Sequence, residues 1–198
     1  MKNLWFGFIF IFLLTASQQV FAQDQRIGLK QYNKARIQYN KNGMLILGSW
    51  AIGNIIWGGI MAGRTSGELR GFHQMNAYWN SVNLLIAGLG YYSTMKEVPS
   101  GDFWETLQIQ QNIEKILLVN AGLDVAYMAG GLYMVERGRR LDNIRLSGFG
   151  KSVIMQGAFL MTFDTVKFLI HNSHGKDLPK ILENISLGLG GFGFKVML

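Results

Sequence analysis

Cysteine is absent from the 198-residue sequence, and charged residues make up only 16% of it. Without cysteine the chain can have no disulfide, no thiolate metal site, no thiol nucleophile and no lipidated N-terminal cysteine. The few charges are gathered between long apolar segments that carry none. This is the pattern of a membrane protein and not the mixed pattern of a soluble core.

Acidic residues are scarcer than basic ones, with 12 Asp and Glu against 19 Lys and Arg and a formal charge of +7. In a soluble protein this excess would suggest nucleic acid as a partner. Here the basic residues cluster at the ends of apolar segments, where lipid headgroups and membrane topology explain them. We therefore expect the lipid bilayer, and no nucleic acid, as the partner of this surface.

Residues 1–22 form the first apolar segment. It opens with Lys2 and ends with Val20, Phe21 and Ala22, so that small residues stand where a signal peptidase reads. The segment is predicted to be a secretory signal peptide cleaved after Ala22, with an uncleaved anchor as the alternative. In either case residue 23 onwards begins on the far side of the membrane from the cytoplasm.

Four further apolar segments follow within a predicted membrane domain of residues 23–170. The predicted spans are residues 43–63, 74–94, 116–135 and 147–170, and the helix of the third is expected to begin at Phe103, after the helix-start residue Asp102. Residues 27–42, with Tyr32 and Tyr39 among lysines, are predicted to be an interfacial helix. The fold class is therefore all-α: an integral membrane bundle of four core transmembrane helices with interfacial helices and an N-terminal signal peptide.

The tail, residues 171–198, is predicted to be interfacial or re-entrant, although a fifth crossing stays open. Its last residues alternate like the final strand of an outer-membrane barrel. That location is not expected, because uncharged helical spans would stop the chain in the inner membrane. His171 and His174 are spaced like a pair of metal ligands, but we expect them to be solvated and expect no metal site.

Arginines mark two loops. Arg64 and Arg70 flank the first, and the second carries Arg137, Arg139, Arg140 and Arg145. Export of residue 23 places both loops on the cytoplasmic side, as the positive-inside rule requires.

An internal repeat is indicated by weak self-similarity. When the chain is aligned with itself so that Gly58 and Gly59 fall on Gly130 and Gly131, a longer loop in the second half then aligns Gly71 with Gly148. Each half reads as a helix pair, so the halves would be related by an axis along the membrane normal.

Polar residues stand near the middle of every predicted span. Asn120, Asp124 and Tyr127 share one stripe of the third helix, which we expect to face protein because a carboxylate in a bilayer is costly. The full candidate binding set is Asn54, Asn80, Asn83, Asn120, Asp124, Tyr127 and Gln156.

Two functions fit these groups. Amide oxygens with one carboxylate suit a small cation, a proton or a polar solute. Alternatively, the polar groups only clamp the helices of a structural or accessory subunit, whose loops dock a membrane partner or a second copy of the chain. No catalytic triad or phosphate loop is present, so we expect neither an enzyme nor a cofactor.

Four stretches resemble an uncharacterised family, a domain of unknown function found in small multi-span membrane proteins of Bacteroidetes-type bacteria. They are residues 48–59, FHQMNAYWNSVN, NAGLDVAYMAGG and GFGKSVIMQGAFLMTFD. The resemblance implies a helical protein of the inner (cytoplasmic) membrane of a Gram-negative bacterium, with the mature N-terminus on the periplasmic side, and it transfers no activity.

Overall fold

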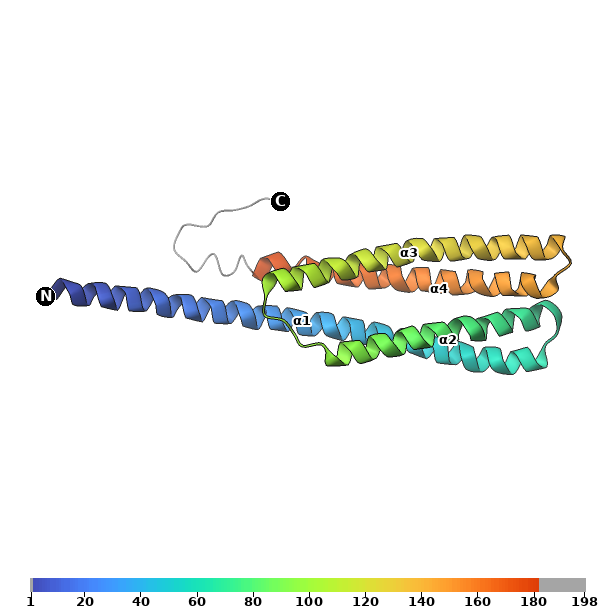
Figure 1. Ribbon diagram of the computed structural model, residues 1–198, viewed down its shortest axis with the longest axis horizontal. Coiled ribbons are helices and arrows are strands. Elements are labelled where there is room, and N and C mark those ends of the chain that lie inside the picture. Colours follow the sequence, from blue (N-terminus) through green and yellow to red (C-terminus); the bar gives the residue numbers. More distant parts are fainter. Residues whose placement is uncertain (1, 182–198) are drawn as a thin grey trace.

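The computed structural model describes residues 2–181, which form four long helices and no strand. They are α1 (Lys2–Arg64), α2 (Gly67–Lys96), α3 (Phe103–Arg140) and α4 (Ile144–Gly175). Helices α1 and α2 form one antiparallel hairpin and α3 and α4 a second, with the two hairpins side by side (Figure 1). The predicted all-helical fold is confirmed.

The two ends of the bundle differ in their connections. The short turns 65–66 and 141–143 lie together at one end, and residues 97–102 join the hairpins at the other (Figure 1). All the arginines of the two predicted loops are exposed at the first end, which we name the arginine end: Arg64, Arg70, Arg137, Arg139, Arg140 and Arg145. The opposite end is named the linker end.

Side-chain caps explain where two helices start. The Asp102 carboxylate accepts a hydrogen bond from the Glu105 backbone N–H at 2.8 Å, and the Asn143 side chain accepts one from Leu146 at 3.0 Å. Such caps satisfy backbone donors that a helix leaves unpaired in its first turn. The predicted start of α3 at Phe103 is confirmed.

Three segments are long and apolar enough to cross a membrane: Gln25–Arg64, Phe103–Arg140 and Ile144–Ile181. Helix α2 is less apolar than these because it carries Asn76, Asn80 and Asn83, all of which are buried. Its outward surface is nevertheless apolar, since Val82, Leu85, Ile86 and Leu89 are exposed. The predicted span in α2 is thus a helix with a polar interior face and an apolar exterior.

The ends of the bundle differ from the expectation in two places. Residues 27–42 are not a separate interfacial helix, because α1 runs through them without a break. The first residues of the predicted tail continue α4 to Gly175, while residues 182–198 lie outside the described part of the chain. The predicted signal peptide falls in the first turns of α1, and its cleavage stays a prediction.

Burial in this bundle is inverted relative to a soluble protein. Many of the most buried side chains are polar, among them Asn80, Ser152, Gln156 and His171. Large apolar side chains such as Ile56, Leu85, Val119 and Leu132 are exposed. This arrangement suits a hydrocarbon solvent, in which polar groups are satisfied inside the bundle.

Glycine brings the two helices of each hairpin into close contact. A methyl group added to Gly58 would lie 2.8 Å from the His73 carbonyl oxygen and 3.1 Å from the Ala77 nitrogen. One added to Gly131 would lie 2.8 Å from the Gly150 carbonyl oxygen and 3.0 Å from the Ile154 nitrogen. The two hairpins therefore pack through nearly the same contact.

The two hairpins also meet through glycine, between α2 and α4. Gly71 lies against the Arg145 backbone of α4, and Gly148 lies against the Glu68 backbone of α2. Small residues at helix interfaces allow backbones to approach without a side chain between them. Helices α2 and α4 therefore form the seam that joins the hairpins.

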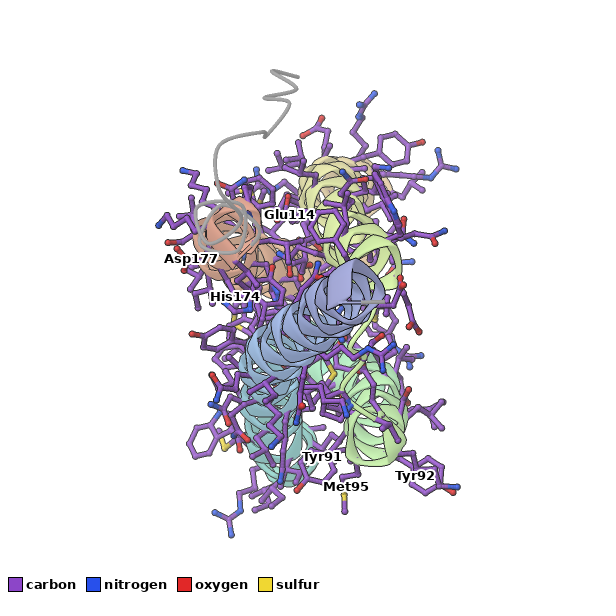
Figure 2. The ribbon with its side chains drawn as sticks, turned by 90° about the vertical axis from the view of Figure 1, so that its left-hand side faces the viewer. Tyr91, Tyr92, Met95, Glu114, His174 and Asp177 are labelled. Atoms are coloured by element: carbon purple, nitrogen blue, oxygen red, sulfur yellow. The ribbon has the colours of Figure 1, made fainter. Side chains whose placement is uncertain are left out.

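The linker end is closed by α1. Leu29 and Tyr32 pack with Leu178, beyond α4, against Phe103 and Leu107 of α3. This part of α1 thus crosses from its own hairpin to the second one, as the end-on view shows (Figure 2).

The linker itself is fastened to α1 by polar contacts. Arg36 is buried and pairs with Glu97 at 2.5 Å. The Asn33 amide donates to the Ser100 carbonyl oxygen at 3.0 Å and to the Thr106 hydroxyl at 2.7 Å. These contacts fix the distance between the hairpins at this end.

Candidate functional site

An amide network fills the middle of the bundle between α1, α2 and α4. The Asn76 amide nitrogen donates to Asn54 Oδ1 at 3.0 Å, and Asn76 Oδ1 accepts from the Gln156 amide. Asn80 donates to the Asn76 carbonyl oxygen at 2.8 Å, and Asn83 donates to Asn80 Oδ1 at 3.4 Å. The network therefore joins both hairpins.

An aromatic pair extends this network. The Trp50 indole N–H donates to Gln156 Oε1 at 3.0 Å, and the Trp50 ring stacks on Phe159 with 3.9 Å between ring centroids. Among the described residues, no buried side-chain atom of Asn54, Asn76, Asn80, Asn83 or Gln156 lacks a hydrogen-bond partner. A network whose buried atoms are all hydrogen-bonded fixes the positions of the helices, and those atoms need no ligand.

Two carboxyl groups lie apart from the network, between α3 and α4. Asp124 is 2% exposed and Asp164 is 7% exposed, and the two carboxyl groups are close enough for each to influence the ionisation of the other. Among the described residues, Asp124 Oδ2 has no hydrogen-bond partner. Close like charges disfavour the doubly ionised state, so this pair favours holding a proton or another cation.

A cavity of about 430 Å³ opens beside these carboxyl groups. Its polar lining is Asn83, Asn120, Asp124 and Asp164, and its apolar and aromatic lining includes Leu47, Trp79, Tyr127, Leu160 and Phe163. The exposed apolar residues Tyr78, Val82 and Ile86 also line it, so the cavity reaches the apolar outer surface. It is large enough for a small solute.

The structure divides the predicted site residues into two groups. Asn54, Asn80 and Gln156 belong to the amide network, whereas Asn120, Asp124 and Tyr127 line the cavity. Asn83 belongs to both groups.

The expectation that the whole stripe of Asn120, Asp124 and Tyr127 faces protein is wrong for one member. Tyr127 is 39% exposed, and its ring meets Trp79 edge-on with 5.0 Å between centroids. Tyr127 and Trp79 therefore bridge α3 and α2 at the cavity. Helix α3 lies further from α2 than α4 does, because α2 packs against α4 at the seam. Asn120 is half-buried.

Sequence reasoning missed three residues of the site. Asp164 lies towards the outer end of its predicted span, yet it meets Asp124. Asn76 and Trp50 are central to the amide network. Asn76 carried a signal, since it shares a stripe with Asn80 and Asn83, while the partners of Asp164 and Trp50 lie on other helices.

The arginine end holds a third polar cluster. Glu68 of α2 accepts hydrogen bonds from Lys151 Nζ at 2.8 Å and from the Ser147 hydroxyl at 2.5 Å, both on α4. The hydrogen bond from Lys151 and then that from Ser147 hold the pKa of the Glu68 carboxyl below its ordinary value. This cluster joins the two hairpins beside their glycine contacts. Among residues 2–181, no group of three or more His, Asp and Glu side chains is placed to hold a metal ion.

Fold and site together define a small protein of two helical hairpins, with helices apolar enough to cross a membrane and polar groups held inside. Residues 46–165 match the model of DUF6992, a family of unknown function, and the chain belongs to that family. No curated protein and no solved structure matches the chain.

Proposed function

We propose that the chain is a multi-pass inner-membrane protein that binds a small cation or polar solute in the cavity at Asp124. The observation that carries the proposal is the contrast between two polar groups at the middle of the helices. The amide network is satisfied by its own members, whereas Asp124 and Asp164 face each other beside a cavity with a carboxyl oxygen left over. A buried pair of carboxyl groups is an expensive clamp, because amides would serve at lower cost.

All four helices cross the membrane in this proposal, with the arginine end in the cytoplasm and the linker end in the periplasm. Support comes from the exposed arginines gathered at one end. Helix α2 crosses as well, because it packs along α1 and turns its apolar face outward. The polar face of α2 is then shielded from lipid by α1 and α4.

The alternative is a structural or accessory subunit that docks a membrane partner or a second copy of the chain. The satisfied amide network favours it, since hydrogen bonds between helices hold a bundle without any ligand. In that case Asp124 would be one more packing group. The two functions differ in whether an ionisable carboxyl group is required there.

We also infer that the two hairpins are repeats, with a packing register that pairs Gly58 with Gly131. The self-similarity of the sequence pairs Gly58 with Gly130 instead. In the first helix of each hairpin, the alignment by packing contacts therefore differs from the alignment by sequence by one position. Gly130 has nothing within 4 Å, whereas Gly131 makes the close contact that Gly58 makes.

Contacts between the hairpins support the same repeat. Gly58 approaches His73 and Ala77 of α2, and Gly131 approaches Gly150 and Ile154 of α4. In the second helix of each hairpin, His73 is therefore equivalent to Gly150 and Ala77 to Ile154. The same register makes Gly71 equivalent to Gly148 and Glu68 equivalent to Arg145. The two contacts between the hairpins are therefore equivalent: Gly71 of the first hairpin lies against Arg145 of the second, and Gly148 of the second lies against Glu68 of the first.

The test of the proposed function is thermal unfolding in detergent of the wild type and Asp124→Asn, across pH and with Na⁺, K⁺, Li⁺ and divalent cations. A ligand of the folded state raises the midpoint by mass action. We expect a shift with one cation, or with protons, that Asp124→Asn removes. The control is Asp142→Asn, the same change in an exposed turn where φ is 49°, a conformation that asparagine tolerates.

The result that would favour the structural subunit is equally clear. Wild type and Asp124→Asn would then unfold alike under every condition. The search for a partner would start from the exposed arginine end.

A further inference from the structure

A stripe of ionisable side chains runs along α4 from the carboxyl pair to the linker end. Asp164, Lys167, His171 and His174 follow one another at intervals of three or four positions, which places them on one face of the helix. The first three are buried, and His171 is 0% exposed, so the expectation that it is solvated is wrong. Burial of three titratable groups in line on one helix face is costly, and apolar side chains would pack there at lower cost.

Contacts across α1 connect the members of this stripe. Lys167 Nζ donates to Asn40 Oδ1 at 3.1 Å and to the Tyr39 carbonyl oxygen at 3.3 Å. The Tyr39 ring lies edge-on to His171 and to His174, with centroid distances of 6.2 and 5.3 Å. His174 stacks on Tyr32 at 3.9 Å between centroids, and its position between α4 and α1 is visible in Figure 2.

Several buried atoms along this stripe have no hydrogen-bond partner among the described residues. They are both ring nitrogens of His171, the Tyr32 hydroxyl oxygen and Gln110 Oε1, in addition to Asp124 Oδ2 at the inner end. A buried imidazole with neither nitrogen bonded to protein is costly. Polar sites of this kind typically hold internal water, which together with imidazole forms a chain that passes protons.

Charged and titratable groups of every neighbouring element face the stripe. Helix α1 contributes Tyr32, Arg36 and Tyr39, the linker Glu97, α3 Glu114 and Asp124, and the segment after α4 Asp177. Arg36 is paired with Glu97, and Glu114 accepts from Gln110 at 2.8 Å. Within the stripe, Asp164 is paired with Asp124, Lys167 donates to Asn40, and His174 bonds to the Tyr32 carbonyl oxygen, whereas the His171 ring has no hydrogen-bond partner among the residues that the structure describes.

We propose that this stripe is a proton path that connects the Asp124–Asp164 pair with the linker end of the bundle. This inference rests on the proposed function and specifies it: the cation bound at the pair is a proton, and it enters from the linker side. On the arginine side of the pair, the amide network, whose groups do not titrate, lies between the pair and the buried His73. Protons therefore reach the pair from one side of the membrane.

The experiment measures which side of the membrane sets the protonation of the pair. Dicyclohexylcarbodiimide modifies protonated carboxyl groups within membranes, and mass spectrometry of peptides identifies the modified residue. Because the chain has no cysteine, Val98→Cys in the linker, where Val98 is 81% exposed, reports orientation through a membrane-impermeant maleimide. Vesicles with the linker end outward are selected through this label.

The outer and inner pH of these vesicles are then changed one at a time during a short labelling. We expect modification of Asp124 and Asp164 to rise several-fold when the linker side is made acidic. It should stay nearly constant when the arginine side is made acidic. His171→Leu should remove the response to the linker side. Ser173→Ala, an exposed position on the same helix, should keep it.

Labelling that follows the arginine side, or that is the same in His171→Leu as in the wild type, would overturn the proton path. If leucine prevents folding, His171→Gln, which keeps a polar but non-titrating group, takes its place. A midpoint shift with a metal cation that Asp124→Asn removes, together with labelling indifferent to pH, would refute the path and leave the proposed binding function standing. Absence of both responses would refute the two together.

Discussion

The two helical hairpins use the same packing contact but fill their interiors differently. Gly58 in the first and Gly131 in the second approach the partner helix with nearly identical distances. At the positions that this register makes equivalent to Asp124 and Asp164, the first hairpin has Ala51 and Ala87, both buried. One scaffold therefore serves as a tightly packed interface in the first hairpin and carries a carboxyl pair in the second.

Amides are divided just as unequally. Helices α1 and α2 supply Asn54, Asn76 and Asn80 to the network, and the second hairpin supplies Gln156. A hydrogen bond between helices contributes on the order of 1 kcal/mol in a membrane, so the first hairpin and the seam hold most of this stabilisation. The hydrogen bonds that stabilise the bundle are thus concentrated in the first hairpin, and the ionisable carboxyl pair lies in the second.

The largest expected effect comes from the paired glycines. Gly58→Ala and Gly131→Ala place a methyl group against backbone atoms, and we expect each to lower the free energy of unfolding by about 1–3 kcal/mol. Their neighbours Gly59 and Gly130 have nothing within 4 Å, so the same change there causes no clash and should leave stability unchanged or raise it by up to about 1 kcal/mol, because alanine favours a helix over glycine. Unfolding in detergent measures all four variants, and equal losses at Gly58 and Gly59, or at Gly130 and Gly131, would contradict the shared packing register.

A smaller effect is expected in the amide network. Asn76→Leu removes the acceptor for Gln156 and the donor to Asn54, and should cost about 1–2 kcal/mol. Asn112→Leu, an exposed position on α3, is the matched control. Denaturant unfolding at one pH would show the difference, and no loss in Asn76→Leu would mean that the first hairpin is held by apolar packing alone.

The smallest effect concerns Glu68, which joins the hairpins at the arginine end. In the folded state the pKa of Glu68 is lowered from its ordinary value of 4.5. The ionised carboxylate therefore stabilises the fold above pH 4.5, and this contribution is lost as the pH falls through the lowered pKa. We expect the thermal midpoint of the wild type to lie slightly above that of Glu68→Gln at neutral pH, and the two midpoints to converge in acid. Thermal midpoints over this range measure the effect, and a difference that persists in strong acid would show that charge is not its cause.

Much of the fold follows from the sequence because helix signals are local. The cap at Asp102, the apolar segments and the buried asparagine stripe of α2 are all read within one helix. The meeting of Asp164 with Asp124 could not be read this way, since periodicity shows which residues share a face but not which helix lies opposite. The exposed position of Tyr127 has the same cause: α2 and α3 are held apart across the cavity, so one edge of the stripe meets the surface.

The small apolar core at the linker end has a consequence for how the molecule is made. Leu29 and Tyr32 lie before the turn of the first hairpin, and Leu178, their packing partner, lies after the second hairpin. Because synthesis runs from the N-terminus, this part of α1 can meet Phe103 and Leu107 of α3 before it can meet Leu178. Complete closure of this core therefore needs the segment after α4, and a chain stopped before Leu178 would leave part of the apolar surface open to chaperones or proteases.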